Sequence, residues 1–372
     1  MDYERKLADM IAGYSIDVKE DENVLISFES IEAVNFVECL IDEISKRKGN
    51  AFIRFDLPRL HNMALEKISD SGIKVLEKEG KLDVENYDSF ISIRSNFNDY
   101  EGVDVPSETR KKIGKRLAKS RDIRVNNKKW VLLNYPTSLD ASKMRMPTKK
   151  FYEYAFKAMC YDYRLMKNDI LPLKELMEKT DMVRIVAPGT DISFSIKGMN
   201  MVPCCGEKNI PDGEIYCAPI KNSVNGVIKY NTPSPYQGLV FHGVTLTFKD
   251  GKIIKASCDE QELVGKLEEI FNSDEGARYV GEFSFGLNPF ILNPMGDILF
   301  DEKIIGSIHF TPGSAYKDSY NGNDSVIHWD MVLIQRPEYG GGEIYFDDVL
   351  IRKDGLFVLD ELKPLNGKET SN

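Results

Sequence analysis

Residues Asn23–Asp56, NVLISFESIEAVNFVECLIDEISKRKGNAFIRFD, place an apolar run of strand length on each side of an amphipathic run of helix length. The apolar runs are NVLISF (Asn23–Phe28) and AFIRFD (Ala51–Asp56), and Ile31–Arg47 between them repeats apolar residues at intervals of three and four. A strand, a helix and a second strand in this order predict parallel pairing through a crossover helix. The stretch therefore predicts an α/β fold.

The same alternation continues through the first half of the chain. Further strand-like runs are Ser89–Arg94, Lys129–Tyr135 and Met182–Val186, and further helical patterns are Leu57–Ser69, Ser107–Ser120, Lys149–Met159 and Tyr163–Lys179. Together they predict an α/β domain with a doubly wound parallel sheet over residues 1–187. Neither GxGxxG nor GxxxxGK[ST] follows any of these strands, so this Rossmann-like domain has no nucleotide motif.

The sequence changes character after Pro188-Gly189, where short strand-like runs are separated by Gly, Pro, Asn and Asp. The expected strands are Gly189–Met199, Leu239–Phe248, Lys252–Ala256 and Glu343–Phe346, and one helix is expected at Asp259–Phe271. This pattern predicts a second, β-rich α+β domain over residues 188–372, mostly antiparallel, with the boundary near Ala187.

Composition restricts the partners and the compartment. The 372 residues are 42% hydrophobic and 29% charged, as expected for a folded protein of two domains. A net charge of -10 disfavours nucleic acid and anionic membrane surfaces, and the basic run Lys111–Arg121 is interpreted as the solvated face of a helix. No stretch approaches the ~20 apolar residues of a membrane span.

The N-terminal segment MDYERKLADMIAGYS is charged and amphipathic, without the apolar core of a signal peptide. Six cysteines are scattered without CxxC spacing, which is typical of buried thiols in a reducing compartment. A cytoplasmic location is therefore predicted.

Two of the four histidines lie among apolar residues, in Ile308-His309-Phe310 and Ile327-His328-Trp329-Asp330. Each histidine taken alone is compatible with a core imidazole hydrogen-bonded to the backbone. In an extended HWD segment, however, His328 and Asp330 project from one face and Trp329 from the other. An imidazole and a carboxylate that converge in this way suit a divalent ion such as zinc, cobalt or manganese.

Further polar side chains occur in the same part of the chain. Glu282 lies in GEFSFG, where small residues alternate with Phe, so its carboxylate needs a nearby cation if it is buried. Glu214 follows a turn in NIPDGEIY, where a surface position is the plainer alternative, and Tyr316 lies in a loop after His309 that could line a cleft. Three carboxylates and two histidines exceed what one structural ion needs and suit a pair of ions bridged by a carboxylate.

At these residues the chain resembles the thermophilic metalloaminopeptidase family, the aminopeptidase T and aminopeptidase S type of leucyl aminopeptidases. The resemblance runs almost from end to end and is carried by ADMIAGYSIDVKEDENVLI, GTDISFSIKG, NIPDGEIYCAP, GEFSFGLNP, IHFTPGSAY, HWDMV and DGLFVLDELKPLN. It implies that the metal ligands are Glu214, Glu282, His309, His328 and Asp330. It further implies two divalent ions (Zn, Co, Mn or Mg), a C-terminal catalytic domain and a homodimer.

The function implied by this resemblance is that of a metal-dependent aminopeptidase, a hydrolase that removes N-terminal residues from peptides by means of a water activated by two metals. Tyr316 is expected to steady the oxyanion, and Glu214 is the candidate for passing a proton to the leaving amine. One departure concerns specificity. The connection from Tyr316 to His328 is short for the family, which is expected to reshape or open the substrate pocket.

Two other functions are compatible with the residues. His309, His328 and Asp330 also compose the two-histidine, one-carboxylate set of non-haem iron oxygenases, although such a site has no use for Glu214 and Glu282. Alternatively, the chain could be a non-catalytic binding module stabilised by metal.

Overall fold

The computed structural model describes residues 2–95, 97, 98 and 100–367. The chain divides into two compact units. The first comprises Met1–Cys160 and Gly206–Ile210, and the second comprises Tyr161–Cys205 and Pro211–Asn372.

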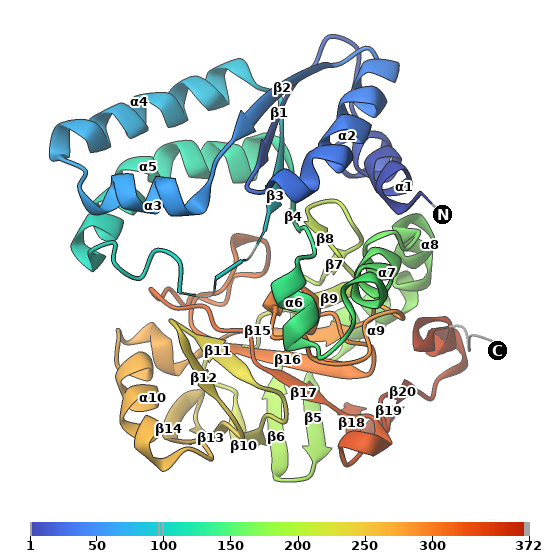
Figure 1. Cartoon of the computed structure of the whole chain (residues 1–372). Coiled ribbons are helices and arrows are strands. Elements are labelled where there is room, and N and C mark those ends of the chain that lie inside the picture. The colour runs from blue at the N-terminus through green and yellow to red at the C-terminus, as the bar shows by residue number, and fades with distance from the viewer. Residues whose placement is uncertain (1, 96, 99, 368–372) are drawn as a thin grey trace. The chain divides into compact units, whose positions relative to one another are not determined.

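The first unit contains a parallel five-stranded sheet, as the sequence predicts. The strand order is β2-β1-β3-β4-β8, and every neighbouring pair is parallel. The strands are β1 (Asn23–Phe28), β2 (Asn50–Phe55), β3 (Ser89–Arg94), β4 (Lys129–Asn134) and the short β8 (Asn209–Ile210). Figure 1 shows α4 and α5 on one side of β1 to β4, and α1 and α2 on the other, so the sheet is covered on both faces.

The helices of the first unit are α1 (Tyr3–Met10), α2 (Val34–Lys46), α3 (Pro58–Glu66), α4 (Asp70–Asn86), α5 (Ser107–Asn127), α6 (Ser138–Lys143) and α7 (Thr148–Met159), with short helical turns at Ile11–Ser15 and Ile31–Ala33. On one side of the sheet, Leu25 and Phe90 pack with Val84 of α4. No described residue of α5 is buried, which confirms that its basic run lies on a solvated face. Among the described residues, no helix is both long and apolar enough to cross a bilayer.

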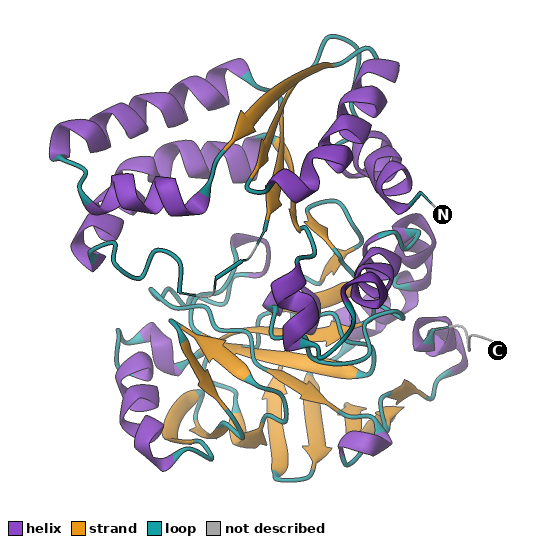
Figure 2. Ribbon diagram, viewed as in Figure 1, coloured by secondary structure: helices purple, strands orange, loops and turns teal. Residues whose placement is uncertain are grey.

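The second unit consists mainly of antiparallel sheets (Figure 2). An eight-stranded sheet has the order β14-β13-β10-β6-β5-β18-β19-β20, and a five-stranded sheet has the order β17-β16-β15-β9-β7. The eight strands are β5 (Met182–Ala187), β6 (Thr190–Ser195), β10 (Asn225–Lys229), β13 (Thr245–Lys249), β14 (Lys252–Ser257), β18 (Glu343–Phe346), β19 (Val349–Lys353) and β20 (Leu356–Phe357). The five strands are β7 (Val202–Cys204), β9 (Glu214–Cys217), β15 (Val280–Gly286), β16 (Ser307–Pro312) and β17 (Val332–Ile334).

The remaining elements of this unit are a two-stranded ribbon and several short helices. The ribbon joins β11 (Ser234–Tyr236) to β12 (Leu239–Phe241), and the α-helices are α8 (Tyr163–Asp169), α9 (Leu171–Lys179), α10 (Val264–Phe271) and α11 (Ile298–Asp301). Single helical turns occur at Gln261–Leu263, Gly276–Arg278, Lys317–Ser319 and Pro337–Tyr339, and a longer 3₁₀ helix spans Asp360–Asn366.

One strand assignment from the sequence is wrong. Met182–Val186 was expected in the parallel sheet, but β5 pairs antiparallel with both β6 and β18 in the second unit. Helices α8 and α9 contact the 3₁₀ helix Asp360–Asn366, so they also belong to the second unit. The chain therefore divides after Cys160, ahead of the boundary expected near Ala187. The change in composition at Pro188 marks the turn of the β5–β6 hairpin rather than a change of unit.

Aromatic side chains join the two large sheets of the second unit. Phe283 and Phe310 of the five-stranded sheet lie with ring centroids 5.0 Å from that of Phe194 in β6, and Phe285 lies 6.2 Å from Phe346 in β18. Because side chains alternate along a strand, this apolar face leaves the other face of β15 and β16 for different residues. Glu282 and His309 lie on that second face.

Trp329 supports this arrangement from the segment before β17. Its ring packs between Tyr236, Phe241 and Phe271, with centroid distances of 4.7–5.9 Å.

We expect Trp329→Ala to lower the free energy of unfolding by about 3–5 kcal/mol, because the truncation leaves a cavity in a packed cluster. Chemical denaturation followed by circular dichroism measures this loss. Val326→Ala removes an apolar side chain that is 79% exposed and should leave the midpoint unchanged. Equal denaturation midpoints for Trp329→Ala and Val326→Ala would contradict a stabilising role for the packing of Trp329.

Candidate metal centre

The structure brings together the five side chains that the sequence singled out as ligands. All of them lie in the second unit, on or beside neighbouring strands of the five-stranded sheet. Glu214 begins β9, Glu282 lies in β15, His309 lies in β16, and His328 and Asp330 precede β17. Strand pairing brings Glu214, Glu282 and His309 together, and the segment before β17 adds His328 and Asp330.

The register of the strands places these side chains on one face. The pairs across β15 are Glu282 with Thr311, Ser284 with His309, and Gly286 with Glu214. Residues directly opposite each other in antiparallel strands project from the same side of the sheet. This is the face opposite Phe283 and Phe285, so the alternation of GEFSFG separates a polar face from an aromatic one, as the sequence predicts.

Glu282 lies between the two histidines. Its Oε1 is 2.8 Å from Nε2 of His309, and its Oε2 is 3.7 Å from Nε2 of His328. His309 Nε2 is also 3.5 Å from Oε2 of Glu214, and His328 Nε2 is 3.3 Å from Oδ1 of Asp330. Glu282 is thus the central member of the cluster.

Backbone carbonyl groups orient both imidazoles. Nδ1 of His309 lies 3.2 Å from the carbonyl oxygen of Glu302, and Nδ1 of His328 lies 2.7 Å from that of Ser314. In each ring the Nδ1–H donates to the backbone, which leaves Nε2 directed at the carboxylates. This is the arrangement in which proteins hold a metal-binding imidazole. The backbone bonds that the core-histidine alternative required are therefore present, but they occupy only one nitrogen of each ring.

The HWD segment is held by the loop before it rather than by a regular strand. His328 forms an isolated antiparallel bridge with Gly313, and β17 begins only at Val332. Gly313 has a φ of 112°, and a Cβ atom there would lie 2.2 Å from the carbonyl oxygen of Ile327. Only glycine permits this close approach. The expected alternation of faces is nevertheless present, because Ile327, Trp329 and Met331 are all buried.

The cluster carries buried charge, and one oxygen of Glu282 lacks a hydrogen bond among the described residues. Glu282 is 3% exposed, and no hydrogen-bond donor among the described residues reaches its Oε2. Burial raises the pKa of Glu282, against the opposing effects of His309 and His328. An unpaired carboxylate oxygen in such a position is costly, and a cation relieves that cost.

The histidines respond to the same carboxylates. Burial alone would lower the pKa of His309, but the hydrogen bond to Glu282 and the charge of Glu214 outweigh it and raise this pKa to about 9. In the same way, Asp330 outweighs burial and raises the pKa of His328 to about 10. Without a metal, both imidazoles are protonated at neutral pH and act as the missing cations. Metal binding would displace these protons.

Several polar residues of the centre were not singled out from the sequence. Glu302 lies with His309 and Asp330 in one group of potential ligands, and Asp212 lies with Cys204 and Glu214 in another. Thr311 donates from Oγ1 to Oδ1 of Asp330 at 2.7 Å. These side chains come from β16 and from turns whose sequence shows no special spacing.

Lys303 was also not singled out from the sequence. In the structure its side chain is fully buried. Its Nζ lies 3.1 Å from Oε1 of Glu214 and forms an ion pair with Glu302. Glu214, for which a surface position was the plainer alternative, is itself only 6% exposed.

Among the described residues, Cys204 is the one cysteine that belongs to a group of potential metal ligands. Burial and the nearby charge of Glu214 raise its pKa well above the usual value. The thiol therefore keeps its proton, which makes Cys204 a poorer ligand than the imidazoles and carboxylates around it.

Tyr316 lies at the open side of the cluster. Its ring centroid is 4.6 Å from that of His328, and 51% of its side chain is exposed. Burial of the phenol end, together with the charges of Asp330 and Glu282, raises its pKa well above the usual value. The phenol therefore remains a hydrogen-bond donor at neutral pH.

The short connection from Tyr316 to His328 is fixed by two asparagines. Asn321 Nδ2 donates to the carbonyl oxygens of Pro219 and Val280, and Asn323 Nδ2 donates to those of Gly276 and Gly313. The loop that ends at His328 is thus tied to the strands that carry the other ligands.

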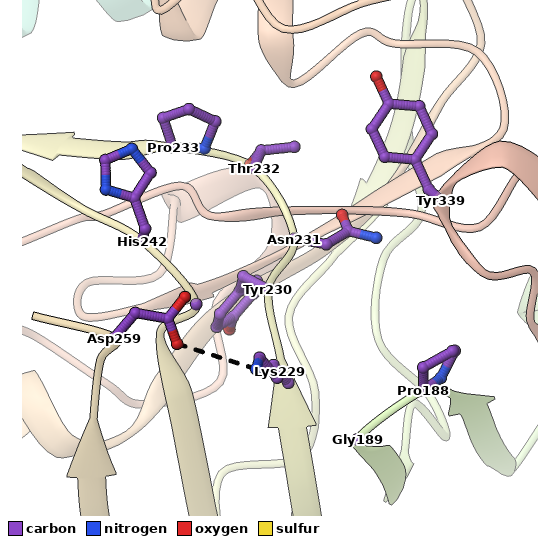
Figure 3. A pocket seen from close by; sticks show the side chains of 11 residues that line it. Pro188, Gly189, Lys229, Tyr230, Asn231, Thr232, Pro233, His242, Asp259 and Tyr339 are labelled. Atoms are coloured by element: carbon purple, nitrogen blue, oxygen red, sulfur yellow. Dashed lines mark ion pairs between the residues drawn. The ribbon is translucent and has the colours of Figure 1, made fainter.

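A separate pocket of about 530 Å³ lies elsewhere in the second unit (Figure 3). The side chains around it include Lys229 and Asp259, whose charged atoms are 3.9 Å apart, with His242 and Tyr339. None of the five predicted ligands lines this pocket. The carboxylate and histidine cluster on the five-stranded sheet is thus distinct from this pocket.

Comparison of the sequence with known proteins finds similarity to aminopeptidases. Over 165 residues, the chain is 32% identical to Aminopeptidase 2 of Geobacillus stearothermophilus, covering 40% of this chain and 37% of that protein. Over 177 residues, it is 30% identical to Aminopeptidase AmpS of Bacillus subtilis (strain 168), covering 40% and 42%. The aligned stretches thus span about two-fifths of these relatives.

Solved structures share the fold across nearly the whole chain. Wild-type AmpT from Thermus thermophilus superposes with a TM-score of 0.78 at 18% identity, covering 96% of this chain and 99% of that one. The 2,5-dihydroxypyridine dioxygenase from Pseudomonas putida KT2440 superposes with a TM-score of 0.63 at 14% identity, covering 96% and 98%. At such identities, these likenesses establish the fold alone.

The family model of the thermophilic metalloproteases (M29) matches residues 3–340 of the 372. This match extends through the first unit into the second, up to residue 340, and contains every residue of the candidate centre. The chain therefore belongs to the thermophilic metalloprotease family M29.

Proposed function

We propose that this protein is a metal-dependent aminopeptidase that hydrolyses N-terminal residues from peptides at a centre of two divalent ions. The observation that carries the proposal is Glu282, a buried carboxylate that lies between two histidines, one of whose oxygens has no hydrogen-bond donor in the part of the chain that the structure describes. Membership of the M29 family and the names of the relatives, which are aminopeptidases, support it.

Two overlapping groups of side chains would hold the ions. Glu214, Glu282 and His309 form one group, and Glu282, His328 and Asp330 form the other, with ligand atoms within 4.8 Å of one another in each. Glu282 belongs to both groups, as a bridging carboxylate must. The mixture of imidazole nitrogen and carboxylate oxygen suits zinc, cobalt or manganese, and magnesium less well. When bound, such ions lower the pKa of water and polarise a carbonyl oxygen.

The chain's own residues would supply orientation and proton transfer. Tyr316 presents a protonated phenol beside His328, where it can donate to the oxyanion that forms as the peptide carbonyl is attacked. Glu214, at the other end of the cluster, is the candidate for passing a proton to the leaving amine. Backbone bonds to His309 and His328 hold both rings in place during these steps. A cytoplasmic location and a homodimer remain predictions from the sequence.

The oxygenase alternative has one structural parallel, since a dioxygenase shares this fold. That likeness extends to the fold alone, and a set of one carboxylate and two histidines leaves Glu214 and Glu282 without a role. A non-catalytic module would likewise need no phenol at the open side of the cluster. The aminopeptidase proposal uses all of these residues.

Removal and replacement of metal tests this proposal. We expect metal-stripped protein to release no p-nitroaniline from a panel of aminoacyl p-nitroanilides, and added zinc, cobalt, manganese or magnesium to restore cleavage. Glu282→Gln should stay at least about a hundredfold less active, because it weakens both groups of ligands. Glu269→Gln, on the exposed face of α10, is the matched control and should behave as the wild type. Full activity of Glu282→Gln, or no cleavage with any metal, would refute the proposal.

The role of Tyr316 is tested separately. Tyr316→Phe should lower kcat about 10²–10³-fold with little change in KM, because it removes a donor to the oxyanion and leaves the ring in place. Steady-state kinetics gives both constants, and elemental analysis should find unchanged metal content. Tyr320→Phe, a partly exposed tyrosine of the same loop, should leave kcat unaffected. A rise in KM alone would show that Tyr316 only contacts the substrate.

A further inference from the structure

Lys303 places a fixed positive charge inside the carboxylate cluster. Its side chain is 0% exposed, and it follows α11 in the turn that leads to β16. Nζ is 3.1 Å from Oε1 of Glu214 and is ion-paired with Glu302. A buried lysine is tolerated only when such partners compensate the loss of water. The ammonium is therefore a built part of the centre.

Among the described residues, this ammonium is ion-paired with a member of the first ligand group, Glu214, and with no member of the second. Glu214 directs Oε1 to Lys303, while its Oε2 accepts from Ser284 Oγ at 3.3 Å and lies 3.5 Å from His309 Nε2. In the second group, by contrast, the ion pairs of Glu282 and Asp330 among the described residues involve histidine alone. Asp330 receives a neutral hydroxyl from Thr311.

Two consequences follow for a divalent ion beside Glu214. It is repelled by an ammonium a few ångströms away, in surroundings that screen charge poorly. It must also share Glu214 with Lys303, so only one oxygen of that carboxylate is readily available. An ion held by Glu282, His328 and Asp330 does not compete with Lys303 for any of its ligands.

We infer that Lys303 makes the two ion positions unequal. The position formed by Glu282, His328 and Asp330 fills first and tightly, whereas the position formed by Glu214, Glu282 and His309 fills second and weakly. The inference rests on the proposed two-ion centre and adds the residue that controls its loading. Lys303 is a positioning residue in this account, because it acts through Glu214 and Glu302.

Calorimetric titration of metal-free protein with Mn²⁺ tests the inference without any measurement of activity. The wild type should load in two steps whose dissociation constants differ by about tenfold or more, or should show the first step alone. In Lys303→Gln the second dissociation constant should fall about 10–100-fold, while the first changes by less than about threefold. Lys303→Arg keeps the charge and should keep the unequal steps.

A matched control is Lys266→Gln, because Lys266 is exposed on α10. Its titration should coincide with that of the wild type. If Lys303→Gln does not fold, the wild-type and Lys303→Arg titrations still test the inference, because it requires two unequal dissociation constants in both proteins.

Two equal steps in the wild type would overturn the inference, as would a second constant that is the same in Lys303→Gln and in the wild type. Either result, together with metal-dependent cleavage of aminoacyl p-nitroanilides, would leave the proposed aminopeptidase intact. Unequal loading that Lys303→Gln abolishes, without cleavage of any substrate, would support the inference and refute the peptidase.

Discussion

The burial of the Glu282 carboxylate is the constraint on which the rest of the centre depends. One of its oxygens contacts His309, and the other has no hydrogen-bond donor among the described residues. Such a group is unfavourable in a folded protein unless a cation neutralises it. In the metal-free state the protonated His309 and His328 neutralise it, and the neighbouring carboxylates raise the pKa of both histidines. A divalent ion neutralises the Glu282 carboxylate while leaving the imidazoles neutral. The residues that are unfavourable together in the metal-free state therefore favour metal binding.

The five-stranded sheet makes this burial possible. One face of β15 and β16 packs Phe283, Phe285 and Phe310 against the eight-stranded sheet, and that contact fixes the register of the strands. Register then decides which side chains share the other face, because a slip by one residue would exchange the two faces. The aromatic core therefore positions Glu282 and His309. Gly313 and the asparagines of the following loop extend the same control to His328 and Asp330.

Local patterns were sufficient to predict the parallel sheet and the polar and aromatic faces of GEFSFG. The five clustered side chains were expected from the family resemblance, and their role as ligands stays a prediction. The strand Met182–Ala187 was misplaced because its apolar pattern is the same in either kind of sheet, and only its partners β6 and β18 decide which sheet it joins. Glu302 and Lys303 were missed for a related reason. Charged residues in the sequence DEK usually lie on the surface, and the burial of Lys303 here depends on strands distant in the chain.

Anomalous diffraction from crystals grown at saturating Mn²⁺ tests the central claim most directly, because it locates ions irrespective of activity. The account predicts density for manganese beside Glu282, with one ion contacted by His328 and Asp330 and a second contacted by Glu214 and His309. Manganese found only elsewhere, for example beside Asp259 and His242 in the separate pocket, would contradict it. So would a crystal at saturating Mn²⁺ in which His309 and His328 still contact the carboxylates directly, with no ion between them.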